Sequence, residues 1–421
     1  MRKKIAEIRD GKRVIIKKPE LLAPAGNLEK LKVAILYGAD AVFIGGKKFG
    51  LRSSADNFSI EEMAEGVQFA KAHNAKIYVT TNIFAHDEDL ADLDAYLIAL
   101  EGAGIYGIIV ADPYIIHRCQ IVAPLVEVHL STQQSLLNWQ TASFYEKEGL
   151  HRVVLAREMM KEEIQEVIDK TAIELEVFIH GAMCIAFSGR CTLSNHMTSR
   201  DSNRGGCCQS CRWEYDLVAE SGAEVVKTIA ADLDQFSMSP KDLSLLQSIP
   251  EMIEMGIDSF KIEGRMKSIH YVATTVSVYR KLIDLYCENP DDFVLDAALI
   301  AELQKCANRA TAESFFHGMP DEKQQLFNSR MEHPTKEFIG ITQGFQKEKN
   351  LLKLEQRNFF KKGDTIEFFG PKMENISWKV TAIFNAAMEE VDAARHPQEI
   401  VYIPFDRELP EYTLMRKLES N

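Results

Sequence analysis

Residues 19–46, PELLAPAGNLEKLKVAILYGADAVFIGG, decide the fold of this chain. The stretch contains a short apolar run at 20–23, an amphipathic segment at helical spacing, and a second apolar run at 41–44. Runs that are apolar on both faces indicate parallel strands covered by helices. The turn after the first run is Ala-Pro-Ala-Gly rather than GxGxxG, so the phosphate loop of a dinucleotide-binding sheet is missing.

The same alternation continues along the chain. The runs that we predict as strands lie at 20–23, 41–44, 77–81, 108–111, 128–131, 153–156, 176–180 and 259–262. Helical stripes such as Leu90, Leu93, Leu97 and Leu100 lie between them. Eight strand–helix units in succession fit a (β/α)8 barrel better than an open doubly wound sheet. We therefore predict an α/β fold built on a TIM-like barrel.

A long excursion separates the last two predicted strands. It holds most of the cysteines, a hairpin formed by 215–220 and 224–229, and a helix near 240–255. A loop of that length within a barrel is usually functional. Two more helices are expected near 270–287 and 296–306.

After a polar stretch the pattern changes to short strands separated by turns, which predicts a small all-β barrel. Its strands are expected at 338–345, 351–356, 364–369, 378–384 and 399–403. The predicted parts are a basic segment at 1–18, a catalytic barrel at 19–318 with a Cys-rich insertion at 184–213, a linker at 319–336 and a β-barrel domain at 337–421.

Composition narrows the class of protein. The chain has 421 residues, 46% of them hydrophobic, which is typical of a globular protein with a large core. Neither an apolar signal core nor a membrane-length apolar run is present, so we expect a cytoplasmic protein and no membrane partner. The net charge of −13 means that a nucleic acid must meet a local basic patch. Two segments qualify, unless their side chains are merely solvated: residues 1–18, and the insertion with Arg190, Arg200, Arg204 and Arg212.

Five of the eight cysteines crowd into the insertion, at 184, 191, 207, 208 and 211. Such density indicates a soft metal, because disulfide frameworks belong to small secreted domains. The wide first pair, Cys184 and Cys191, favours an iron–sulfur cluster over a structural zinc, with no metal as a third alternative. Cys207 and Cys208 cannot easily both be ligands, so one of them is a spare thiol.

In a (β/α)8 barrel the chemistry takes place at the carboxyl ends of the strands. The polar or permissive residues there are Pro24, Gly45, Gly46, Thr81, Asn82, Asp112, Thr132, Gln133, Arg157, Glu158, His180 with Cys184, Glu263 and Arg265. Charges of both signs in one cleft suit a small polyanion, although any single strand end can be polar simply because it meets water.

The cysteine region resembles a known family. EVFIHGAMC at 176–184 followed by GRCTLS at 189–194 matches the signature of the peptidase U32 family, which is described as collagenase-like. Similar stretches are ELLAPAG at 20–26, LRSSA at 51–55, NRGGC at 203–207 and KIEGRMK at 261–267. The resemblance covers essentially the whole chain, including a C-terminal barrel that looks like the second domain of translation elongation factors.

Within this family the chain is most similar to a branch that installs 5-hydroxyuridine at the wobble position of tRNA. The resemblance implies a [4Fe-4S] cluster on Cys184, Cys191, Cys207 and Cys211, with the adjacent Cys208 leaving the third ligand open. It also implies a dependence on prephenate. The alternatives are a U32-type peptidase, for which neither HExxH nor GxSxG is present, and a non-catalytic RNA-binding zinc protein.

Roles can be assigned to the candidate residues on this basis. Arg52, Arg157 and Arg265 stand near strand ends, where guanidinium forks could bind carboxylates. His180 or Glu263 could move a proton, or could instead be a backbone-bonded core histidine and a structural ion-pair partner. We expect Arg204 and Arg212 to hold the tRNA backbone. The oligomeric state and the oxygen source do not follow from the sequence.

Overall fold

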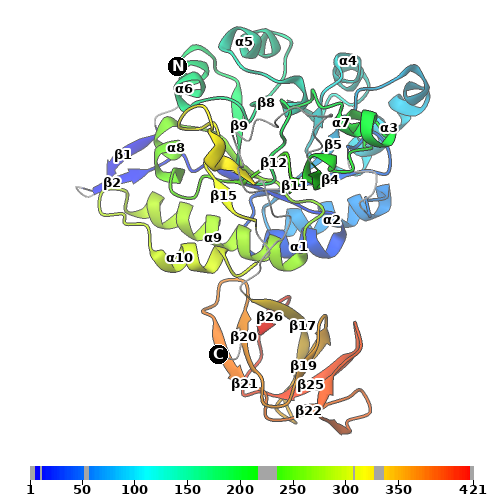
Figure 1. The fold of residues 1–421 in the computed structure, drawn as a ribbon, viewed down its shortest axis with the longest axis vertical. Helices are drawn as coiled ribbons and strands as arrows, with labels where there is room; N and C mark the ends of the chain where they lie inside the picture. Colours follow the sequence, from blue (N-terminus) through cyan, green and yellow to red (C-terminus); the bar gives the residue numbers. More distant parts are fainter. Residues whose placement is uncertain are drawn as a thin grey trace, which may run out of the picture.

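A computed structural model of the chain describes residues 5–9, 12–51, 56–216, 235–306, 309–326 and 336–417. Eight parallel strands form a closed barrel in the larger domain (Figure 1). They are β3 (Glu20–Pro24), β4 (Ala41–Gly45), β5 (Lys76–Thr81), β6 (Gly107–Val110), β7 (Glu127–Leu130), β8 (Arg152–Val154), β9 (Glu174–Gly181) and β14 (Ser259–Ile262). Each strand pairs with the next, and β14 pairs with both β9 and β3, which closes the ring. The predicted barrel is confirmed, and its strand bounds agree within two residues.

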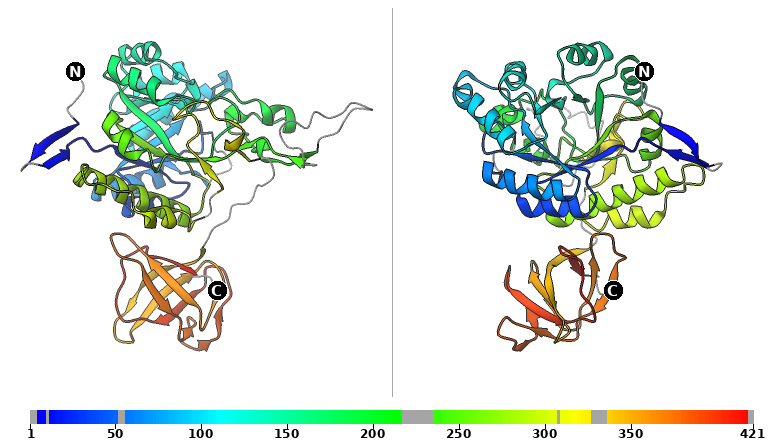
Figure 2. Two further views of the ribbon diagram at one scale, coloured as in Figure 1. Left: turned by 60° about the vertical axis from the view of Figure 1, so that its left-hand side comes forward. Right: turned by 180° about the vertical axis from the view of Figure 1, so that it is seen from behind.

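Helices surround the barrel on its outer side (Figure 2). They are α1 (Leu28–Leu36), α2 (Ile60–Ala72), α3 (Leu93–Gly102), α4 (Pro113–Val122), α5 (Trp139–Lys147), α6 (Lys161–Lys170) and α9 (Ile269–Glu288). Side-chain caps fix the starts of α1 and α2: Asn27 accepts from the amide of Lys30, and Ser59 forms a capping box with Glu62. Each cap fixes the residue at which the helix begins, so the loop from the preceding strand is short or well defined at its end.

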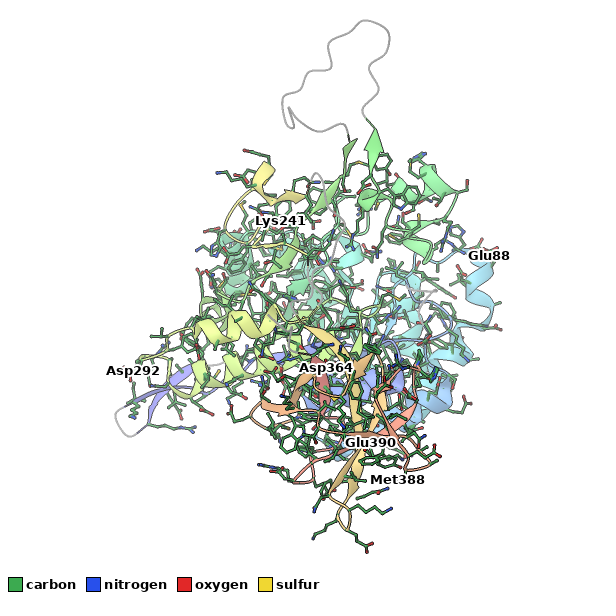
Figure 3. All side chains as sticks on the ribbon, turned by 60° about the horizontal axis from the view of Figure 1, so that its bottom comes forward. Glu88, Lys241, Asp292, Asp364, Met388 and Glu390 are labelled. Carbon is green, nitrogen blue, oxygen red and sulfur yellow. The ribbon has the colours of Figure 1, made fainter. Side chains whose placement is uncertain are left out.

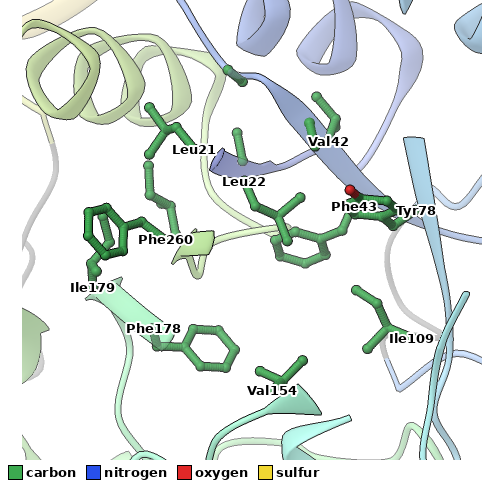
Figure 4. Packing of buried hydrophobic residues seen from close by; sticks show 14 of the residues in the cluster. Leu21, Leu22, Val42, Phe43, Tyr78, Ile109, Val154, Phe178, Ile179 and Phe260 are labelled. Carbon is green, nitrogen blue, oxygen red and sulfur yellow. The ribbon is translucent and has the colours of Figure 1, made fainter. Parts of the chain in front are cut away.

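The barrel interior is filled by side chains rather than open. Figure 4 shows Phe43, Ile109 and Phe178 pointing toward the barrel axis, while Ile179 and Phe260 face the surrounding helices. All five are at most 5% exposed. This packed layer leaves room for a ligand only above it, at the carboxyl ends of the strands.

The excursion after β9 differs in part from expectation. The helix predicted at 240–255 is wrong in its first half, because β12 (Ser239–Pro240) and β13 (Asp242–Ser244) are strands and only α8 (Ile249–Met255) is helical. Strand β13 pairs with β9 and with β15 (Thr311–Ala312), while β12 pairs with β16 (Gln325–Leu326). The predicted hairpin of 215–220 with 224–229 lies largely outside the described residues. Its first two residues form β10 (Tyr215–Asp216), which pairs with β11 (Gln235–Phe236), beyond the predicted second strand.

The C-terminal domain is built on an eight-stranded antiparallel sheet curled into a half-barrel, and it also holds a two-stranded sheet of β19 (Phe360–Lys361) and β24 (Ala393–Ala394). The strands of the larger sheet, in spatial order, are β21 (Ile376–Lys379), β20 (Thr365–Phe369), β26 (Leu414–Lys417), β17 (Glu337–Gln346), β18 (Leu351–Gln356), β25 (Ile400–Pro404), β22 (Ile383–Phe384) and β23 (Glu390–Val391). The strand predicted at 378–384 is wrong, because the chain leaves the sheet between β21 and β22. Strand β26 was not predicted.

The two domains are joined by buried polar contacts. The Tyr37 hydroxyl of α1 donates to the carbonyls of Phe369 and Tyr412, both at 3.0 Å. Arg416 of β26 is fully buried and pairs with Glu302 of α10 (Ala297–Leu303) and with Glu367 of β20. An interface of this kind holds the C-terminal domain in a fixed position against α1, α9 and α10.

Candidate functional site

A cavity of about 160 Å³ opens at the carboxyl ends of the barrel strands. Its walls carry polar strand-end side chains, including Thr80, Asn82 and Ser131, and four of the clustered cysteines. Asn82 donates to the Ser131 hydroxyl at 3.4 Å, which links the ends of β5 and β7 across the strand that lies between them. The cavity therefore combines amide and hydroxyl groups with thiols on one side.

Three cations line this cavity. Arg157 donates to the carbonyl of Ala182 at 2.6 Å and lies 3.5 Å from the carboxylate of Glu263. Arg265 is 3% exposed and donates to the Thr80 hydroxyl at 2.8 Å. Lys261, on β14, is also buried and lies over the Phe43 ring. The structure thus brings the predicted Arg157, Arg265 and Glu263 together, and Lys261 joins them on the cavity wall.

Lys261 belongs to a buried ion network below the cavity. Its ammonium group lies 2.6 Å from Glu176, which is fully buried and also contacts Arg152 at 3.2 Å. Arg152 in turn pairs with Glu20 at 2.5 Å and with the half-exposed Glu174 at 2.8 Å. Burial acts to raise the pKa of Glu176, but the charges of Lys261 and Arg152 outweigh it and lower that pKa. Glu176 is therefore ionised and holds Lys261 in place.

The cysteine segment folds over the cavity mouth. Cys184, Cys191, Cys207 and Cys211 all line the cavity, and Cys184 and Cys207 are exposed. Burial, and next the charge of Cys184, raises the pKa of Cys211 to about 11, with Cys207 and Cys191 acting in the same direction. Thiolates crowded in this way repel one another, and a bound metal cation relieves that repulsion. Among the described residues, no three His, Cys, Asp or Glu side chains are arranged to hold a single metal ion.

Local hydrogen bonds shape this segment. The carbonyl of Cys191 accepts from the Ser202 hydroxyl at 2.7 Å and from the Asn203 amide at 3.0 Å. A side chain at Gly206 would place its Cβ 2.6 Å from the carbonyl oxygen of Asp201, so only glycine allows this tight turn before Cys207. The NRGGC motif at 203–207 therefore has a structural purpose, because it directs Cys207 into the cavity.

Cys208 is directed elsewhere. Its sulfur lies 3.4 Å from the Ser194 hydroxyl and 3.3 Å from that of Thr198, and Ser194 and Thr198 both lie on α7 (Leu193–Thr198). These hydrogen bonds, that with Ser194 first, lower the pKa of Cys208. Since Cys208 does not line the cavity while Cys207 does, the geometry favours Cys207 over Cys208 as the third ligand.

His180 does not line the cavity of the cysteines. A register shift between β9 and β14 sets Lys261 opposite Phe178 but Ile262 opposite His180, so β9 has an extra residue there. The imidazole consequently lies against Tyr271 and Tyr279 of α9, and the Tyr279 hydroxyl is 3.3 Å from its Nδ1. This position corresponds to the core histidine that we considered as the alternative to a proton carrier.

The basic residues predicted to hold RNA have different surroundings. Arg204 pairs with Asp89 at 2.6 Å and with Glu88, labelled in Figure 3, at 3.1 Å. Arg212 donates to Gln209 at 3.0 Å. Arg190 and Arg200 are exposed, and their side chains make no hydrogen bond or ion pair within the part of the chain that the structure describes. Arg52 lies outside the described residues.

Three basic residues in the described part of the N-terminal segment pair with carboxylates of the barrel. The segment forms a hairpin of β1 (Ala6–Arg9) and β2 (Lys12–Ile15). Arg13 pairs with Glu254, Lys17 with Asp258 at 2.5 Å, and Lys18 with Asp284 at 3.2 Å. Separately, none of the helices that the structure describes is long and apolar enough to cross a membrane.

Comparisons with known proteins cover the whole chain. The model for Peptidase family U32 matches residues 26–326, and that for the Peptidase family U32 C-terminal domain matches residues 334–416. The tRNA hydroxylation protein P1 of Bacillus subtilis is 60% identical over 414 residues, which is 98% of each chain. The 23S rRNA 5-hydroxycytidine synthase of Escherichia coli is 36% identical over 72% of this chain and 44% of its own length. A collagenase of Porphyromonas gingivalis is 33% identical over 71% of this chain and 73% of its own length.

The buried network gives a first testable prediction. Replacing Glu176 by alanine leaves Lys261 and Arg152 without their buried carboxylate, so the free energy of unfolding should fall by about 3 to 5 kcal/mol in denaturant titrations. Glu174→Ala is the matched control, since Glu174 contacts the same Arg152 from a half-exposed position. It should cost about 1 kcal/mol or less. Equal losses in the two variants would contradict the role given to burial.

Proposed function

The chain belongs to peptidase family U32, and we propose that it is a tRNA-modifying enzyme that hydroxylates C5 of a uridine. The observation that carries this proposal is the 60% identity, along the full length, to a tRNA hydroxylation protein. A second relative is named for a 5-hydroxylated pyrimidine in ribosomal RNA, so the two names share hydroxylation of an RNA base. The peptidase alternative has weaker support, because His180 packs against α9 and does not line the cavity that Cys184 lines.

We propose a [4Fe-4S] cluster on Cys184, Cys191, Cys207 and Cys211. A four-iron cluster gives each thiolate its own iron atom, which suits four thiols that share a cavity without meeting at one point. When bound, the cluster would supply electron transfer beside the cavity. Asn203, Ser202 and Gly206 fix the backbone that carries the ligands.

Arg157, Arg265 and Lys261 form the proposed binding site for prephenate, a dicarboxylate. Guanidinium forks bind carboxylates with two parallel hydrogen bonds, and a buried setting strengthens the attraction between opposite charges. The Thr80 hydroxyl accepts from Arg265 and so orients its guanidinium, while Glu263 faces Arg157. Glu263 is the group on this wall that can accept a proton from a bound substrate.

The RNA must reach this cavity with its target base unstacked, because a stacked base cannot enter it. Arg190 and Arg200 replace Arg204 in our assignment of backbone contacts. Their guanidinium groups have no partner in the described part of the chain, whereas Arg204 is held by Asp89 and Glu88. Exposed, unpaired arginines on an acidic protein are suited to bind phosphate groups.

Nucleoside mass spectrometry of tRNA tests the function. A strain that lacks this protein and any redundant pathway should lose 5-hydroxyuridine and the nucleosides derived from it, and expression of the intact chain should restore them. Unchanged nucleosides in the deletion strain would contradict the proposal. Cleavage of a collagen-like peptide by pure, metal-analysed protein would support the peptidase alternative in its place.

Iron and sulfide analysis tests the ligand assignment. Cys207→Ala should lose iron and sulfide together, because one of four thiolate ligands is removed. Cys208→Ala is the matched control and should keep both iron and sulfide, because the Cys208 sulfur is hydrogen-bonded to the hydroxyls of Ser194 and Thr198. The reverse pattern would make Cys208 the third ligand.

Two substitutions test the prephenate site. Arg265→Ala should raise the prephenate concentration for half-maximal hydroxylation by about 10- to 100-fold, since a charge-assisted pair is lost. Gly45→Ala should act in the same direction, because its Cβ would lie 2.0 Å from Nη1 of Arg265 and displace the guanidinium. Gly102→Ala, with no atom within 4 Å of its Cβ, is the control. A normal prephenate response in Arg265→Ala would remove Arg265 from the site.

A further inference from the structure

One turn at the cavity mouth combines an exposed aromatic ring with an unpaired cation. Residues 187–190, which we call the rim turn, are closed by a hydrogen bond of 3.0 Å from the Arg190 amide to the Phe187 carbonyl. Phe187 lines the cavity, yet it is 51% exposed. Arg190 is exposed as well, and its guanidinium makes no hydrogen bond or ion pair within the described residues.

The rim turn is held firmly by its neighbours. The Ser188 amide and hydroxyl donate to the Glu158 carboxylate at 2.9 and 3.0 Å, and the Ser188 carbonyl accepts from the Ser135 hydroxyl. Gly189 has a φ of +73°, and a Cβ there would lie 2.0 Å from the carbonyl oxygen of Gln133. The backbone is therefore fixed against the strand ends, while the Phe187 ring remains accessible.

The other two phenylalanines of the cavity are arranged differently. Phe43 and Phe178 are 4% and 5% exposed. Both rings already face cations: Lys261 lies over Phe43 at 4.7 Å, and the Arg157 guanidinium lies over Phe178 at 3.9 Å. The Phe187 ring has no aromatic or cation–π contact within the described part of the chain, so its face is open to a ligand.

We propose that Phe187 is the platform on which the unstacked pyrimidine of the RNA lies as it enters the cavity, with Arg190 on an adjacent phosphate. This inference rests on the proposed function. An accessible π-face three residues from an unpaired guanidinium matches the two parts of a nucleotide, base and phosphate. A rigid backbone under the ring lowers the entropy lost on binding. Phe187 is thus a positioning residue for the substrate base.

Substitutions of Phe187 separate stacking from simple hydrophobic contact. Phe187→Ala should lower kcat/KM for tRNA hydroxylation by about 10- to 100-fold, the range expected for loss of one base–aromatic stack. Phe187→Leu keeps an apolar side chain without a π-face and should be nearly as poor, while Phe187→Tyr should restore most of the activity. Iron content should stay at the level of the unmodified protein. Phe144→Ala is the matched control, because Phe144 is 55% exposed on α5 and does not line the cavity.

Binding of unmodified tRNA to the same full-length proteins decides the inference independently of catalysis. Phe187→Ala should weaken binding at every salt concentration with an unchanged salt slope, whereas Arg190→Ala should reduce that slope by about one. The platform would be overturned if the Phe187→Leu protein matched the unmodified protein both in its rate of tRNA hydroxylation and in its affinity for tRNA. If the unmodified protein does not hydroxylate tRNA, the proposed function is wrong. The binding data then still decide the role of Phe187. A tRNA affinity that depends on the ring at position 187 would support the platform, and a tRNA affinity that does not would overturn it.

Discussion

The closing contact of the barrel, between β9 and β14, is the constraint on which the site depends. The Glu263 amide donates to the His180 carbonyl at 2.8 Å, and the Tyr271 hydroxyl donates to the Glu263 carbonyl at 2.9 Å. Gly181 makes this approach possible, since a Cβ there would lie 2.5 Å from the Glu263 carbonyl oxygen. Cys184 follows Gly181 by three residues. The contact between β9 and β14 therefore fixes where the cysteine segment begins and where Glu263 and Arg265, which follow β14, are placed.

Charge is distributed unevenly over this acidic protein. Arg13 and Lys17 of the N-terminal segment pair with carboxylates of the barrel, and Arg204 pairs with Asp89. Arg157, Arg265 and Lys261 instead line the cavity, and Arg190 stands unpaired in the described part of its rim. Cations at the cavity and on its rim can attract an anion even when the net charge of the protein is −13, because the field near the surface follows nearby groups.

Much of the fold could be predicted from the sequence, because apolar runs and helical stripes are local patterns. The strand ends gave Arg157, Arg265 and Glu263 correctly as neighbours of one cavity. The cysteine spacing pointed to this segment but left Cys207 and Cys208 as alternatives, and the four thiols that line the cavity are those that the family resemblance implied. The orientation of His180 could not be predicted, since it depends on a register shift between two strands about 80 residues apart. The partners of Arg204 could not be predicted either, because Glu88 and Asp89 lie in a 3-10 helix at Asp87–Asp92, far from Arg204 in the sequence. The short strands β12 and β13 depend on tertiary pairing, which overrode the helical pattern.

The joint between the domains has a thermodynamic consequence. Ile341, Phe369 and Leu414 belong to the C-terminal sheet, yet they are buried in the same apolar cluster as the barrel helices. The C-terminal sheet also has a second cluster of its own, so its two faces serve different cores. Unfolding either domain alone would expose apolar surface of the other and leave Arg416 without Glu302. The free energies of the two domains are therefore coupled, because loss of one domain removes part of the burial that stabilises the other.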